Sequence, residues 1–226
     1  MLLASAFVAE IDELKNNFDV RSIYSKEMGQ ALAKKVDQHL LQLAFIASDN
    51  NATLTGGNFG GNVTDADCKT NAESMIASIF EAIQKLDEND VPSSDRYIVT
   101  TPDIYYQLCN VDKLVSRDFS SNNGDFGKGT VVSIGGVPVI KSNTAVSAFT
   151  DQSGASTTGQ NNTYTGDFQH CGAMVFHKSA VGTVKLKDLV MESTYDPRRL
   201  GTLMTARMAM GSNFLRPESA VRIIAQ

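Results

Sequence analysis

Several features that usually reveal a protein's function are scarce in this chain of 226 residues. Basic residues do not outnumber acidic ones, and the net charge of −5 argues against binding of nucleic acid through bulk charge. No stretch approaches the roughly 20 apolar residues that a membrane-spanning helix needs. The hydrophobic content of 42% is nevertheless sufficient for the core of one large domain or two small ones.

Cysteine is also scarce. Cys68, Cys109 and Cys171 are odd in number and far apart in the sequence, so we expect buried, reduced thiols rather than disulfides. The apolar stretch Met1–Val8 has no basic region and no evident cleavage site, and we do not interpret it as a signal peptide. These observations favour a cytosolic chain.

Sequence motifs of catalytic, nucleotide-binding and metal-binding sites are missing as well. Gly127–Thr130 superficially resembles a phosphate-binding loop, but the G-x-x-x-x-G-K-[ST] order is absent and a strand is expected where a helix should begin. There is no G-x-S-x-G nucleophile elbow. His170, Cys171 and His177 lie near one another, yet a zinc site needs four ligands and no second pair exists. We therefore predict no catalytic residue, no cofactor, no metal and no enzymatic activity.

The most informative feature that is present is a helical pattern from Asp19 to Ser48, which would extend about 40 Å. Its apolar residues recur every three to five positions and therefore line one face. They are Ile23, Met28, Leu32, Val36, Leu40, Leu43 and Ile46. A helix about twice the usual length is typical of a structural beam.

The sequence between the ends alternates helix and strand. Ala9–Phe18 predicts a short acidic helix, and the capping box Thr70–Glu73 predicts a second helix over 70–86. Arg96–Thr100 is expected to be a buried strand, and Thr101 with Pro102 begins a helix that ends near Leu108. This order suggests a small α/β subdomain.

Short strands are expected in the remainder. Thr130–Ile134 and Val137–Ile140 would form a hairpin through Gly135-Gly136, with Pro138 placing the second strand at a sheet edge or bulge. The polar run 142–165 is expected to be a surface loop. Further extended segments are predicted at Gly172–Lys178, Leu189–Ser193, Thr202–Met210 and Ala220–Ala225.

Charged and methionine side chains near both ends are candidates for contacts between copies of the chain. The methionines from Met204 to Met210 alternate along a predicted strand, which fits either a core face or a subunit contact. The C-terminal arginines form either a solvated face or salt bridges to the acidic cluster of another subunit; the acids also fit simple helix capping. The candidate contacts are Glu10, Asp12, Glu13, Arg198, Arg199, Arg207, Met208, Met210 and Arg216.

Several sequence blocks match a known pattern in the same order along the chain. They are Phe18-Asp19-Val20-Arg21-Ser22-x-Tyr24, Met28-Gly29-Gln30-Ala31-Leu32-Ala33, Val91-Pro92-x-x-Asp95-Arg96, Pro102-Asp103-x-Tyr105, Phe176–Leu189 and Leu215–Ala220. Together these blocks resemble the major capsid proteins of the short-tailed phages of the T-odd, or autographivirus, group. The resemblance covers essentially the whole chain and is weakest over 51–69 and 142–166.

The resemblance implies an α+β chain with the Hong-Kong-97-type phage capsid fold, in which a long spine helix and peripheral-domain strands carry an inserted α/β axial domain. Residues 1–50 would hold the end of the extended loop and the spine helix. Residues 51–187 would form the axial domain, and 188–226 the returning peripheral strands. The family carries an N-terminal arm and an extended loop before the segment that matches Leu2–Asp19, so we expect a fragment or an unusually short member.

The resemblance also implies a virion structural protein that self-assembles into hexamers and pentamers of an icosahedral shell enclosing phage double-stranded DNA. Its partners would be further copies of itself, a scaffolding protein during assembly, a portal at one vertex and DNA contacted non-specifically on the inner face, with no membrane. Its location would be the virion, after assembly in the host bacterial cytoplasm. The alternative is an encapsulin-like nanocompartment subunit. A third hypothesis, a small hydrolase, lacks a nucleophile motif.

Overall fold

The structure is a computed structural model that describes residues 1–15, 19–51, 57–111, 114, 124–125, 130–131, 133–153 and 164–225. The chain divides into two compact units. Unit 1 comprises the described residues of 1–37 and 183–212, and unit 2 those of 38–182 and 213–225. Helix α2 (Val20–Ser48), strand β9 (Val181–Asp196) and strand β10 (Gly201–Phe214) each contribute residues to both units.

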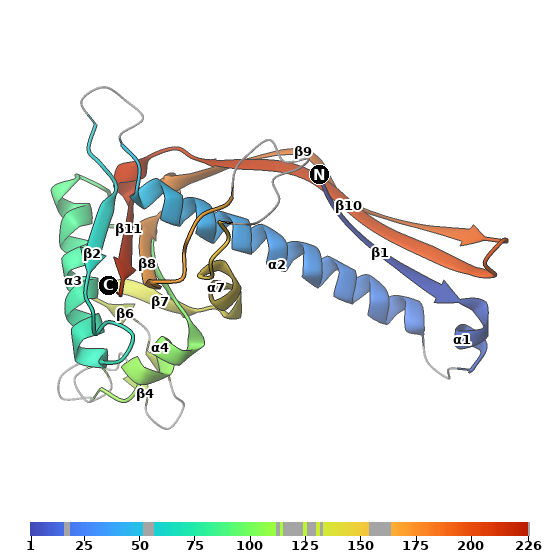
Figure 1. The fold of residues 1–226 in the computed structure, drawn as a ribbon, viewed down its shortest axis with the longest axis horizontal. Coiled ribbons are helices and arrows are strands. Elements are labelled where there is room, and N and C mark those ends of the chain that lie inside the picture. The colour runs from blue at the N-terminus through green and yellow to red at the C-terminus, as the bar shows by residue number, and fades with distance from the viewer. Residues whose placement is uncertain are drawn as a thin grey trace. The chain divides into compact units, whose positions relative to one another are not determined.

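Unit 1 contains a three-stranded sheet in the order β1-β10-β9 (Figure 1). Strand β1 (Leu2–Ala9) pairs antiparallel with β10, from Leu2 opposite Met208 to Ala9 opposite Gly201. The short helix α1 (Glu10–Lys15) follows β1 directly. One face of the sheet packs against α2, and the buried residues of this small core are Val8, Met28, Leu32, Met204 and Ala206.

Helix α2 confirms the predicted long helix, and its burial changes along its length. The carboxylate of Asp19 accepts hydrogen bonds from the backbone N–H groups of Arg21 (3.1 Å) and Ser22 (3.3 Å) and so caps the helix. Within unit 1 only one stripe of the helix is covered, and Ile23, expected on that stripe, is 51% exposed. Within unit 2 the run 41–45 is buried at every position, because protein surrounds these turns.

Unit 2 is built on a six-stranded mixed sheet in the order β2-β11-β8-β3-β7-β6 (Figure 1). The strands are β2 (Gly61–Thr64), β3 (Arg96–Thr100), β6 (Ser133–Ile134), β7 (Val137–Lys141), β8 (Cys171–His177) and β11 (Ala220–Ile224). β8 is antiparallel to both β3 and β11, whereas β3 pairs in parallel with β7 and β11 with β2. A separate pair joins β4 (Gly124–Asp125) to β5 (Thr130–Val131).

Helices cover both faces of this sheet. On one face, α3 (Ala72–Glu88) and α4 (Pro102–Leu108) contribute Met75, Ile79 and Leu108 to the larger core. On the other face, the last turns of α2 and the helix α7 (Asn143–Ala148) pack around Met174 of β8. Adjacent residues of β8 therefore serve two different cores, as the alternation of side chains along a strand requires.

Two local predictions were wrong. Helix α3 begins at Ala72, not Thr70, because the side chain of Asn71 accepts the hydrogen bond from the backbone N–H of Glu73 (3.0 Å). Thr70 instead donates to the carbonyl of Asp67. The run 142–165 is not entirely loop, since it contains α7, whose Ala145 and Ala148 are fully buried. Small alanines allow this polar segment to pack closely.

The predicted hairpin at Gly135-Gly136 is confirmed, with φ values of +58° and +79° that glycine adopts readily. Pro138 lies in β7, which is not the edge strand, because β6 occupies the edge. Pro138 faces Ser133 of β6, and the pairing of β7 with β3 starts one residue later, at Val139. The segment 126–129, which contains most of the phosphate-loop-like motif, lies outside the described residues.

The division into units differs from the expected domain boundaries. Residues 38–50 and 213–225 belong to unit 2, because the last turns of α2 lie in its core and β11 is a strand of its sheet. Residues 183–187, expected in the inserted domain, belong to unit 1. The three cysteines are buried free thiols, as predicted, and burial raises the pKa of each.

We expect Leu32→Asp to lower the free energy of unfolding by about 3 kcal/mol or more, because the new carboxylate would be buried without a partner. Leu32 is 5% exposed between α2 and the β1–β10 sheet. Gln30→Asp introduces the same residue at an exposed position of the same helix and should cost far less. Urea denaturation of both variants tests this, and equal stabilities would contradict the assigned buried face.

Candidate functional site

Most of the contact residues proposed from the sequence gather at one end of unit 1. The backbone N–H of Glu10 donates to the carbonyl of Leu200 (3.0 Å), and the Tyr195 hydroxyl donates to the Glu10 carboxylate (3.1 Å). These bonds place the acidic helix α1 beside the turn between β9 and β10, which carries Arg198 and Arg199. We call α1 together with the turn 197–200 the charged tip.

Glu13 is already paired within the chain. The guanidinium of Arg21 contacts both carboxylate oxygens of Glu13, one of them at 2.8 Å, and also donates to the Thr202 hydroxyl at 3.1 Å. This hydrogen bond from Arg21 lowers the pKa of Glu13. Arg21 was not predicted from the sequence, because it belongs to a different helix and no regular spacing links it to Glu13.

Other members of the charged tip are open to a partner. Within the described part of the chain, the side chains of Asp12 and Arg198 make no hydrogen bond or ion pair. The Arg199 guanidinium lies 4.0 Å from the Asp196 carboxylate, a long and exposed contact that contributes little stability. The charged tip therefore carries exposed side chains of both signs.

The remaining candidates lie elsewhere. Arg207 pairs with Glu192 across β10 and β9, and Arg216 belongs to unit 2, where it pairs with Glu218 at 2.7 Å. Met208 is partly buried against the core between α2 and the sheet, so its contacts support the core-face interpretation. Met210 is half-buried.

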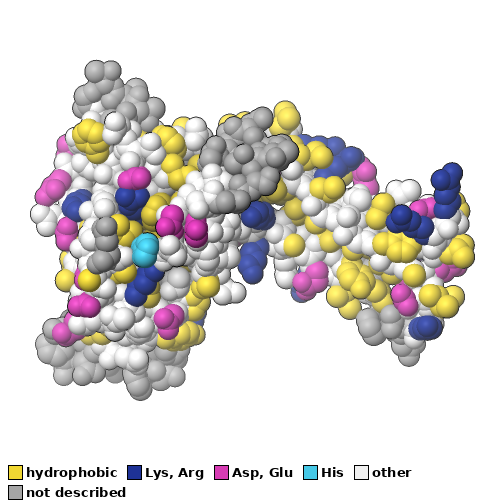
Figure 2. All heavy atoms as spheres, viewed as in Figure 1, with side chains coloured by type: hydrophobic (Ala, Val, Ile, Leu, Met, Phe, Trp, Pro, Cys, Tyr) yellow, Lys and Arg dark blue, Asp and Glu magenta, His cyan; other side chains and the backbone are white. Residues whose placement is uncertain are grey.

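Exposed apolar residues on the sheet of unit 1 were not predicted from the sequence either. Along β9, large hydrophobic side chains are exposed at both odd and even positions, with Leu186 89% and Val184 74% exposed. Exposed hydrophobic side chains also occur on β1 and β10, and Figure 2 shows hydrophobic side chains intermixed with charged ones over this part of the molecule. We call the exposed large hydrophobic residues of this sheet, which lie on both of its faces, the apolar sheet surface; they are Leu3, Phe7, Val184, Leu186, Leu189, Met191 and Leu203. Apolar residues at both odd and even positions are typical of a strand covered on both faces, so the sequence pattern does not show that β9 is exposed in the single chain.

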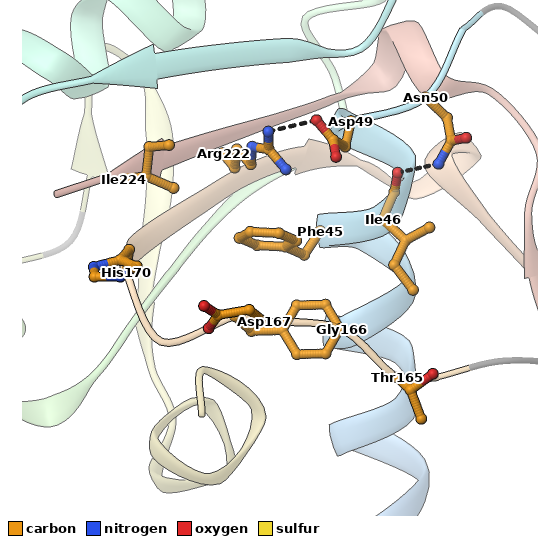
Figure 3. A pocket seen from close by; sticks show the side chains of 11 residues that line it. Phe45, Ile46, Asp49, Asn50, Thr165, Gly166, Asp167, His170, Arg222 and Ile224 are labelled. Atoms are coloured by element: carbon orange, nitrogen blue, oxygen red, sulfur yellow. Dashed lines mark hydrogen bonds and ion pairs between the residues drawn. The ribbon is translucent and has the colours of Figure 1, made fainter. Parts of the chain in front are cut away.

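Unit 2 contains a pocket of about 320 Å³ between the end of α2, the segment 165–170 and β11 (Figure 3). Arg222 donates to the Asp49 carboxylate at 2.5 Å, and its guanidinium lies 4.7 Å from the centre of the Phe45 ring. The Asp167 carboxylate accepts hydrogen bonds from Gln169. The charged groups of the pocket thus mostly bind one another, and no nucleophile and base are paired among the residues that line it.

The described residues were also compared with the requirements of a metal site and of a membrane-spanning helix. They contain no cluster of three or more histidine, cysteine or acidic residues arranged to hold a metal ion. Among the described helices, none combines the length and the apolar character that crossing a membrane would require.

Comparison with known proteins decides the family. A family model described as "Gp10A-like: Major capsid protein" matches residues 1–224. The chain belongs to the Gp10A-like family of major capsid proteins. This confirms the resemblance found in the sequence.

Relatives of this Gp10A-like chain come from phages. It is 28% identical to the minor capsid protein of Escherichia phage T7, covering all of this chain and 62% of that protein, and 28% identical to the T7 major capsid protein, covering 99% and 70%. The chain therefore spans less than two thirds of the minor capsid protein. The capsid structure of cyanophage P-SCSP1u superposes with a TM-score of 0.88 at 32% identity, covering all of this chain and 72% of that one.

These matches confirm the predicted Hong-Kong-97-type fold for the Gp10A-like chain. They do not favour the encapsulin-like alternative, because the matched family and the relatives above are phage capsid proteins.

A pH titration tests the Glu13–Arg21 pair. We expect the Glu13 carboxylate to titrate below its ordinary value of 4.5, because the guanidinium stabilises its charged form. The stability that the pair contributes is present above that value and is lost as the pH falls through the lowered pKa. Carboxyl ¹³C shifts measure this directly, and in Arg21→Gln the Glu13 pKa should return toward 4.5. An unchanged pKa in that variant would refute the pairing.

Proposed function

We propose that the chain is a shell subunit of a phage capsid, which self-associates into hexamers and pentamers around double-stranded DNA. Membership of the Gp10A-like family supports the proposal, and the apolar sheet surface of unit 1 is the observation that carries it. A chain working alone in water would expose Leu186 and Val184 at a continuing cost, whereas a neighbouring copy would cover them.

The position of β9 strengthens this argument. β9 is an edge strand of sixteen residues, so the backbone N–H and C=O groups on its outer side lack strand partners among the described residues. Long, exposed and hydrophobic edges promote association with other chains unless they are covered. A shell in which copies cover one another removes this hazard, and modest contacts become effective because each subunit makes several of them.

The charged tip fits the same proposal. It carries the exposed and unpaired groups of Asp12 and Arg198, so a second copy could pair with both signs of charge. Such pairs fix the orientation of subunits more than they add affinity. We infer that Asp12, Arg198 and Arg199 act in this way, while Glu10 and Glu13, whose carboxylates bind Tyr195 and Arg21 within the chain, remain proposed contacts of the tip. Arg207, Met208, Met210 and Arg216 remain proposed contacts outside the tip.

The wider role follows as part of the proposal. The subunit would act with a scaffolding protein during assembly and with a portal at one vertex, and it would touch packaged DNA without sequence preference. Its net charge of −5 suits a container, since a strongly basic wall would immobilise the genome. Assembly would take place in the host bacterial cytoplasm, the product would be the virion, and no catalysis and no membrane would be involved.

Electron microscopy and sedimentation of Leu186→Asp test the apolar sheet surface. We expect the variant to keep the melting temperature of the parent chain, because Leu186 is 89% exposed, and to lose shells or capsomers, because a carboxylate cannot be buried at the contact. Val146→Asp alters an exposed aliphatic residue of unit 2 outside this surface and is the matched control. Failure of the full-length parent protein to assemble, with or without a scaffolding protein, would refute the proposed function.

A charge exchange tests the charged tip. Asp12→Arg and Arg198→Asp should each weaken association, and the double variant should recover it, because the exchanged charges can pair again between copies. Analytical ultracentrifugation at low and high salt measures the effect, which should shrink as salt screens the pair. No recovery in the double variant would show that these two residues do not meet across an interface.

A further inference from the structure

His177 occupies a junction that the proposed function leaves unexplained. It is the last residue of β8 and is 6% exposed. The 3₁₀ turn η2 (Lys178–Ala180) then leads into β9, and a second turn, η3 (Pro217–Ser219), leads from the end of β10 into β11. The two turns lie together, because the backbone N–H of Leu215 donates to the carbonyl of Ala180 at 2.8 Å. β9 therefore begins beside the point at which β10 ends.

One ring nitrogen of His177 starts a chain of hydrogen bonds between the two turns. Nδ1 accepts a hydrogen bond from the backbone N–H of Ser179 (3.2 Å) and lies 2.7 Å from the Ser179 hydroxyl oxygen. That hydroxyl in turn lies 3.0 Å from the hydroxyl of Ser219, which is fully buried in η3. The imidazole thus supports the direct contact between η2 and η3.

The hydrogen bond from the backbone of Ser179 requires a ring that is unprotonated at Nδ1. A backbone N–H can only donate, so Nδ1 must carry a lone pair, and the proton of the neutral ring sits on Nε2. The imidazolium carries protons on both nitrogens. Protonation would therefore place one N–H group against another and would remove the hydrogen bond from the backbone N–H of Ser179 in η2.

Among the surrounding charges, one carboxylate favours protonation and three cations oppose it. They come from the turn before β3, from β3 itself, from η2 and from the segment before η3: Asp95, Arg96, Lys178 and Arg216. Burial lowers the pKa of His177, and the three cations lower it further, while Asp95 raises it. The Asp95 carboxylate is itself paired with Lys178 at 2.5 Å.

We propose that His177 is an acid-sensitive lock, which holds η2 against η3 while its ring is neutral and releases them when the ring is protonated. The released histidine binds a proton more readily than the locked one. The lock is therefore fully engaged above the ordinary histidine pKa of about 6.5 and weakens as the pH falls below it. The proposal concerns the single chain and does not depend on shell assembly.

Hydrogen exchange on the purified full-length chain tests the lock. After correction for the intrinsic pH dependence of exchange, protection of the amides of 179–181 and 215–220 should fall about tenfold for each pH unit below about 6.5, until the lowered pKa is reached. The amides of α3, which lie away from the junction, should keep their protection. Unchanged protection of the two turns between pH 7.5 and 5 would overturn the proposal.

His177→Asn provides the matched variant, because its side-chain oxygen can accept the Ser179 bond but cannot titrate in this range. The pH-dependent loss of protection should disappear in this variant and persist in His170→Asn, which changes an exposed histidine of the same unit. The same loss in His177→Asn would overturn the proposal. Should His177→Asn not fold, ¹⁵N shifts of the parent imidazole decide: a neutral Nε2–H ring supports the lock, and a protonated ring with η2 intact overturns it.

Discussion

Strand β8 limits how unit 2 can fold, because five consecutive residues from Cys171 to Val175 are buried. A strand buried on both faces needs a covering layer on each side and a paired strand along each edge. The first requirement fixes α3 and α4 on one face and the end of α2 with α7 on the other. The second brings together β3 and β11, which lie far apart in the sequence.

The parts of the fold that depend on local signals could be predicted from the sequence, whereas the parts that depend on pairing with β8 could not. The long helix α2 and the turn at Gly135-Gly136 were predictable because their signals are local: an apolar period and a pair of glycines that tolerate positive φ. The assignment of β11 to unit 2 was not, because it depends on pairing with β8, more than forty residues earlier in the chain. The start of α3 was missed for a smaller reason, since Asn71 and Thr70 are both good caps and only the backbone geometry selects between them.

For the candidate site, too, the residue types could be predicted from the sequence, whereas their contacts could not. The acids of α1 and the arginines 198 and 199 could be chosen from their charge, but not the bond from Glu10 to Leu200 that brings them together. The methionines of β10 could not be assigned to core or contact, because alternation shows that residues share a face but not what that face meets. The exposed state of β9 was hidden for the same reason, since a strand awaiting a partner and a strand inside a core have the same pattern.

The burial of the three cysteines has a practical consequence. Cys68, Cys109 and Cys171 are inaccessible, and their raised pKa values keep them in the unreactive thiol form near neutral pH. A thiol-specific dye added to the folded chain should therefore hardly react with the three natural cysteines. A single cysteine introduced on the outer surface of β9 would then be labelled alone, so fluorescence from that position could follow the meeting of two chains in real time, without first removing any natural residue.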